Sequence, residues 1–233
     1  MDFVSNYLIN IAGIPSNTVI LLFTLPFLAT LIGTFRYIIG LRTFNLYPHL
    51  ILTYIFFQLS INQVGSGYDQ LGGIKYGLFI VVFTLLCTSI IKAVTNRINM
   101  HFIPKKALII SFICLCLLTS LVFASLLYRS SFINVDLIVL LMIIVIAEEY
   151  LSMYTKRGFM VALKMSLGTL VLSIGMFLLI TYDKFQSLIL SNSWIIVVVI
   201  LLNFFIGKYL GLRITEYFRF RNLLEDDNDI STD

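Results

Sequence analysis

Seven long apolar segments in a chain of only 233 residues constrain the fold more than any other feature. They cover residues 17–41, 47–62, 76–94, 106–128, 135–154, 158–182 and 193–212. A helix needs about 20 mostly apolar residues to cross a hydrocarbon core of roughly 30 Å, and lipid admits only helices and closed barrels. Barrel strands alternate apolar with polar residues, which the run IIVVVILL at 195–202 does not. The sequence therefore predicts an all-α polytopic membrane protein, a bundle of seven transmembrane helices.

Composition leaves little room for a soluble domain beside this bundle. Apolar residues make up 59% of the chain and charged residues 12%, against roughly 45–50% and about 25% in ordinary soluble domains. We expect residues 1–16 to form an interfacial lead on the outer face, residues 17–221 the seven-helix domain, and residues 222–233 an acidic cytosolic tail. The lead has no lysine or arginine, whereas a secretory signal begins with basic residues.

Lysine and arginine are distributed unevenly between the two sets of loops. The first, third and fifth loops, with the C-terminal tail, hold 13 of the 16 basic residues; Lys75, Arg129 and Lys184 fall on the other side. Because cytoplasmic loops carry the excess of positive charge, the N-terminus is predicted outside and the C-terminus inside. The net charge of +4 follows from these loops, so it indicates the lipid bilayer and no nucleic acid as partner.

The residue types that usually carry chemistry are sparse and scattered. Cys87, Cys114 and Cys116 all lie within apolar segments, and the last two point about 200° apart on a helix, since each residue advances about 100°. His49 and His101 are expected at cytosolic helix ends, without a second ligand at metal spacing. The sequence therefore predicts no catalytic residue, no metal site and no cofactor.

Two acidic residues come closest to the middle of a predicted span. Glu148 and Glu149 stand in the cytosolic third of the fifth segment, with Lys164 at a comparable depth in the sixth and Arg36 near the inner end of the first. Charges within a membrane usually pair or mark a functional path. We expect Glu148 to bridge to Lys164 or to Arg36; an intramembrane enzyme that uses Glu148 and Glu149 as acids is a weaker alternative.

The inner ends of the segments give the predicted interaction residues. A charged inner-face cluster is expected from Arg36, Arg42, Glu148, Lys164, Arg213, Glu216 and Arg219. Gly207 and Gly211 have the four-residue spacing that lets two helices approach closely, so they are predicted to pack helices together or to form a homo-oligomer. The glycine-rich stretch 64–73 reads as a flexible outer connector.

Five stretches, taken in order, resemble a known family. They are LPFLAT at 25–30, RYIIGLRTF at 36–44, IPKKA at 103–107, AEEY at 147–150 and GKYLGLRITEYFRFR at 207–221. The chain resembles the bacterial family of seven-transmembrane domains usually fused to an inactive transglutaminase-like domain, which in that family precedes the helices outside the cytosol. This sequence has no such domain before its first segment, so we expect it either to act alone or to be a fragment.

The resemblance implies a bacterial inner-membrane location and particular partners. The family is associated with ATP-grasp peptide ligases and with retropepsin-like proteases, and it supplies no catalytic residues. It therefore implies a receptor-like or scaffolding module that couples an extracytoplasmic event to a cytosolic ATP-grasp ligase, with an extracytoplasmic partner domain. A transporter or channel remains the alternative, although the sequence shows no internal repeat of the kind common in transporters.

Overall fold

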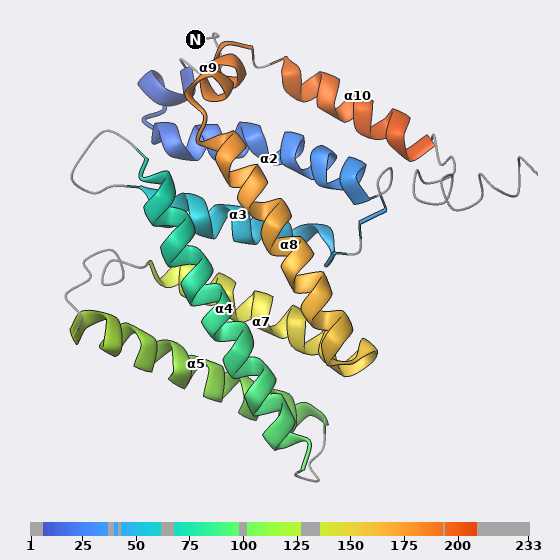
Figure 1. Cartoon of the computed structure of the whole chain (residues 1–233). Coiled ribbons are helices and arrows are strands. Elements are labelled where there is room, and N and C mark those ends of the chain that lie inside the picture. Colours follow the sequence, from blue (N-terminus) through green and yellow to red (C-terminus); the bar gives the residue numbers. More distant parts are fainter. Residues whose placement is uncertain are drawn as a thin grey trace, which may run out of the picture. The chain divides into compact units, whose positions relative to one another are not determined.

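The computed structural model describes residues 7–36, 40–41, 43–61, 68–97, 102–126, 136–192 and 194–208, and these are mostly helical (Figure 1). The elements are η1 (Tyr7–Ile11), α2 (Ser16–Thr34), α3 (Leu46–Ser60), α4 (Gln70–Thr95), α5 (Phe102–Leu126), α7 (Leu137–Arg157), α8 (Phe159–Ile180), α9 (Asp183–Ser191) and α10 (Ile195–Lys208). They form two compact units: unit 1 comprises residues 1–46 and 182–233, and unit 2 residues 47–181.

Unit 1 is built around α2. The helix packs against η1, α9 and α10, and its residues Val19 and Phe23 form a small core with Ile189 of α9. The side-chain amide of Asn203 in α10 donates to the hydroxyl of Thr30 in α2 over 2.7 Å. Such interhelical bonds hold helices together where lipid supplies no hydrophobic drive. The polar residue at the centre of the last segment therefore joins two helices.

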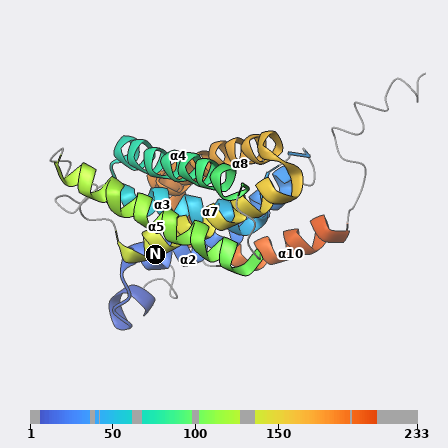
Figure 2. The ribbon, with the colours of Figure 1, turned by 90° about the horizontal axis from the view of Figure 1, so that it is seen from below.

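Unit 2 contains α3, α4, α5, α7 and α8. In Figure 2, α4 and α8 lie along the upper side of this unit with α5 and α7 below them, and α4 contacts all three of these helices. Gly158 alone connects α7 to α8; its φ of 86° and ψ of 165° place it in a region that only glycine adopts without strain. The two helices consequently form a very tight hairpin.

The structure confirms the helical, polytopic reading and refines the predicted spans. Every predicted apolar segment overlaps a helix, and five helices are long and apolar enough to cross a membrane: α2, α4, α5 (counted over Pro104–Val122), α7 and α8. A sixth span results if α9 and α10, which meet at 97°, are counted as one bent element. Among the described residues α3 has only 15 residues, about 22 Å at 1.5 Å each.

Helix ends differ from the prediction where local chemistry outweighs hydropathy. α4 begins at Gln70, six residues early, because the Asp69 carboxylate accepts a hydrogen bond from the backbone N–H of Gly72 at 2.9 Å and so caps the helix. The expected connector 64–73 thus ends in a helical turn, and Gly72 and Gly73 are buried. The short helix α9 was not predicted at all.

Candidate functional site

The residues of the predicted inner-face cluster fall in different parts of the molecule. Arg36 belongs to unit 1, where its guanidinium donates to the carbonyl of Phe44 over 3.4 Å. Glu148 and Lys164 belong to unit 2. The remaining members lie outside the described residues: Arg42, Arg213, Glu216 and Arg219. The cluster as a whole therefore stays a prediction, and only its unit 2 members can be examined together.

Glu148 forms an ion pair, but with a residue that the sequence did not suggest. Its Oε1 accepts from the Nζ of Lys106 in α5 at 3.0 Å, with 35% of the lysine and 48% of the glutamate side chain exposed. The expected bridge to Lys164 is absent. Glu148 lies ten residues before Gly158 on α7, and Lys164 lies six residues after it on α8. At 1.5 Å per residue, their distances from the turn along the two helix axes differ by about 6 Å. A pair this exposed contributes about 0–1 kcal/mol.

The inner-end charges of unit 2 nevertheless gather at one end. The C-terminal ends of α4 and α7 and the N-terminal ends of α5 and α8 lie together (Figure 1). We call this the basic end; its described basic residues are Lys92, Arg97, Lys105, Lys106, Lys156, Arg157 and Lys164. At the opposite end of unit 2, Lys75 is the described basic residue.

Lys92 differs from the other members of the basic end. Its side chain is only 9% exposed, whereas the others are half-buried or exposed. It continues the face of α4 that carries Thr84 and Thr88, two buried residues four positions apart. Each of these hydroxyls donates to a carbonyl of its own helix over 2.7 Å. The four-residue spacing of Thr84, Thr88 and Lys92 is visible in the sequence and places them on one face of a helix. We did not predict this face from the sequence.

A second buried polar region joins α3 to α8, and we call it the α3–α8 seam: His49, Thr53, Thr169 and Ser173, all at most 1% exposed. The carbonyl of His49 accepts from Thr53 at 2.8 Å and from Ser173 at 3.3 Å. Ser173 also donates to the carbonyl of Thr169 at 2.8 Å. These hydroxyl bonds satisfy polar atoms within and between helices, which is what buried polar groups require.

The seam sets His49 beside the middle of α8. His49 is the fourth residue of α3, but Ser173 lies near the middle of α8, roughly 12 Å along the helix from Thr181. The α3 helix begins beside the middle of α8, so a residue at a helix start is not at the bundle end. His49 thus lies in the first turn of a helix, as expected, while its cytosolic placement stays a prediction; His101 lies outside the described residues.

Glycines pack two helices closely in unit 2. A Cβ added at Gly73 would lie 2.7 Å from Ser60 Cβ and 2.9 Å from the carbonyl oxygen of Phe56, and one added at Gly77 would collide with the Phe56 ring. Gly73 and Gly77 thus let α4 approach α3. A Cβ at Gly207, where we predicted packing, would meet nothing within 4 Å in the described part of the chain, and Gly211 lies outside it.

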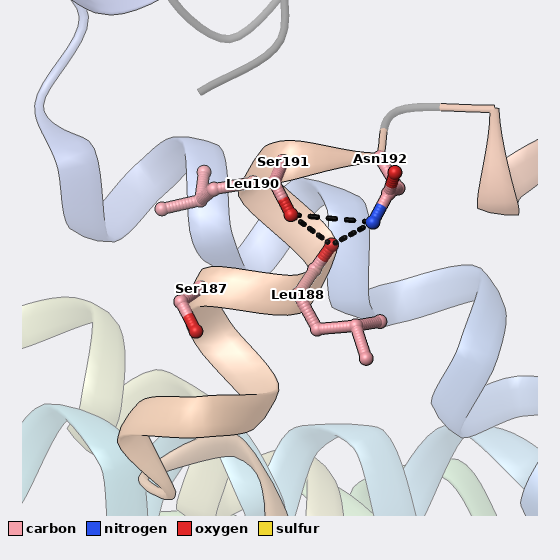
Figure 3. Close-up of a pocket in the computed structure, with 5 residues that line it drawn as sticks. All are labelled: Ser187, Leu188, Leu190, Ser191 and Asn192. Atoms are coloured by element: carbon pink, nitrogen blue, oxygen red, sulfur yellow. Dashed lines mark hydrogen bonds between the residues drawn. The ribbon is translucent and has the colours of Figure 1, made fainter.

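A shallow groove of about 530 Å³ borders α9 in unit 1 (Figure 3). Its lining consists of Ser187, Leu188, Leu190, Ser191 and Asn192. The carbonyl of Leu188 accepts from Ser191 at 3.1 Å and from the amide of Asn192 at 3.3 Å. These polar atoms close the C-terminal end of a nine-residue helix, so local capping accounts for them.

Cys87 of α4 and Cys116 of α5 are neighbours between two helices that pack together, and all three cysteines are free. Oxidation of intact membranes with copper phenanthroline is expected to join Cys87 to Cys116, protecting both from alkylation by a maleimide polymer after denaturation. Cys114→Ser should leave this protection intact, because Cys114 points to another side of α5. Protection that survives Cys116→Ser would contradict the packing of α4 on α5.

The described residues contain no group of three or more His, Cys, Asp or Glu side chains placed to hold a metal ion. A sequence model of the family described as seven transmembrane helices usually fused to an inactive transglutaminase matches residues 8–224. No curated protein and no solved structure matches the chain.

Proposed function

Because the chain belongs to the family of seven-transmembrane-helix domains usually fused to an inactive transglutaminase, we propose that it is a non-catalytic, receptor-like or scaffolding module of the bacterial inner membrane. In this proposal seven helices span the bilayer with the N-terminus outside and the C-terminus inside. The module couples an extracytoplasmic event, sensed with a partner domain, to a cytosolic ATP-grasp peptide ligase.

The observation that carries the proposal is the basic end of unit 2. Seven described lysines and arginines gather where α4, α5, α7 and α8 begin or end, against Lys75 at the opposite end. Such an excess marks the cytosolic side of membrane proteins. It also offers a charged surface to an acidic partner, since complementary potentials steer association. The exposed pair Lys156 and Arg157, at the turn between α7 and α8, is the most accessible part of this surface.

Crosslinking in native membranes, followed by purification and mass spectrometry, tests this function. The unaltered protein is expected to capture an ATP-grasp ligase, and the double variant Lys156→Gln, Arg157→Gln is expected to lose most of that capture. The matched control is Lys75→Gln, an exposed lysine at the opposite end of the same unit, which should retain it. Capture of no cytosolic protein, or capture that is equal in both variants, would count against a scaffold.

The α3–α8 seam supports a transporter or channel as the second candidate. Polar and ionisable groups at membrane depth often mark ion or proton paths, and His49 lies beside the middle of α8. The hydroxyls of the seam, however, donate to backbone carbonyls, which favours a packing role. Proteoliposomes containing a pH-sensitive dye would separate the two: a proton flux above that of empty vesicles, abolished by His49→Ala, would favour transport.

A further inference from the structure

Among the lysines and arginines that the structure describes, Lys92 is the one whose side chain is more than nine-tenths buried. It lies in the last turn of α4, three residues before the helix ends at Thr95. Lysines near the ends of membrane helices normally extend to the interface, as the exposed Lys156 and Lys164 do. A buried charge is costly unless an anion pairs with it.

The chain does not supply that anion from its described residues. Lys92 forms no hydrogen bond or ion pair with any of them, and Glu148 is bound by Lys106 at 3.0 Å. The connection between α4 and α5, residues 96–103, contains no aspartate or glutamate. The charged neighbour of Lys92 is Lys105 of α5, which has the same sign. Two cations therefore lie together between α4 and α5, where an external anion would offset both.

We propose that Lys92 and Lys105 bind the phosphate of an anionic phospholipid. Basic pockets between transmembrane helices near the membrane surface are a known form of headgroup site. The surface that continues from Lys105 is apolar and exposed, as acyl chains require: Phe112, seven residues further along on the same face of α5, is 48% exposed. The phosphate would lie between two ammonium groups with its acyl chains along this surface.

The test uses the full chain in nanodiscs of phosphatidylcholine with or without phosphatidylglycerol, followed by thermal unfolding and by native mass spectrometry of retained lipid. The unaltered protein is expected to unfold at a higher temperature with phosphatidylglycerol and to retain that lipid. Lys92→Met should reduce retention at least about fivefold, since one cation near the membrane surface contributes about that factor. In phosphatidylcholine alone the same variant should be more stable than the unaltered protein, because an unpaired buried charge has been removed.

Lys75→Gln is the matched control, since it removes an exposed lysine at the opposite end of unit 2 and should leave retention unchanged. If Lys92→Met does not fold, Lys92→Arg and Lys105→Gln carry the test, with retention kept in the first and reduced in the second. Equal retention in Lys105→Gln and the unaltered protein would overturn the proposal. So would a fall in stability in phosphatidylcholine alone when the acidic residues of 225–229 are neutralised, since the acidic tail would then be the anion that pairs with Lys92.

Discussion

Gly73→Ala is expected to destabilise the protein by about 1–3 kcal/mol, the usual cost of an overpacked methyl group. The new Cβ would lie 2.9 Å from the carbonyl oxygen of Phe56 and 3.1 Å from the Cα of Ser60. Both are backbone atoms, so α3 would have to move away from α4. Gly73→Leu should prevent folding. The measurement is the free energy of unfolding in a detergent titration.

Gly175→Ala in α8 is the matched control, because a Cβ there would meet nothing within 4 Å. Alanine favours a helix over glycine by roughly 1 kcal/mol, so this variant should be as stable as the unaltered protein or slightly more so. The same substitution is thus expected to act in opposite directions at two helical glycines. Equal stability of Gly73→Ala and Gly175→Ala would show that α3 and α4 do not pack as described.

Tyr150→Ala should give the second large effect, a loss of about 3–5 kcal/mol, as is typical when a buried aromatic side chain is removed. Tyr150 is 1% exposed, its ring stacks on that of Tyr154 at 6.3 Å, and its hydroxyl bonds Ser89 of α4 at 2.8 Å. Removal of the ring leaves a cavity between α7 and α4. Thermal unfolding in detergent measures the loss.

Two further variants separate the ring of Tyr150 from its hydroxyl. Tyr150→Phe keeps the packing and removes one interhelical hydrogen bond, which contributes about 0.6 kcal/mol on average within a membrane bundle. Leu141→Ala truncates a side chain on the same helix that is 55% exposed, and its effect should stay within about 0.5 kcal/mol. A loss in Tyr150→Phe as large as in Tyr150→Ala would mean that the hydroxyl, not packing, joins the two helices.

The sequence predicts the helices well because each is a long apolar run. The hydropathy of a run can be read without knowing which other helices pack against it. It predicts their ends less well. α2 ends at Thr34 although the apolar segment continues to residue 41, and α4 begins at an Asp69 cap that hydropathy does not register. The amphipathic α9 was missed because its nine residues include Asp183 and Lys184, which read as a connector.

The candidate site was harder to predict, since it depends on which face of a helix meets which neighbour. The choice of Lys164 for Glu148 rested on similar distances from a turn, but Glu148 faces α5 and meets Lys106. Lys92 is buried because α4 packs against α5, α7 and α8. This packing belongs to the tertiary structure, so the sequence of α4 alone does not predict it. Gly73 and Gly77 have the four-residue spacing of close helix packing, but Gly73 lay in the stretch 64–73 that resembled a flexible loop, so the pair was not recognised.

The single-residue connection at Gly158 has a mechanical consequence for unit 2. Because a single residue connects Arg157 to Phe159, the connection is too short for α8 to slide lengthwise along α7. Movement of one helix at this end is therefore expected to carry the other, so that α7 and α8 tilt as a pair about Gly158, with the Lys156–Arg157 surface at the turn.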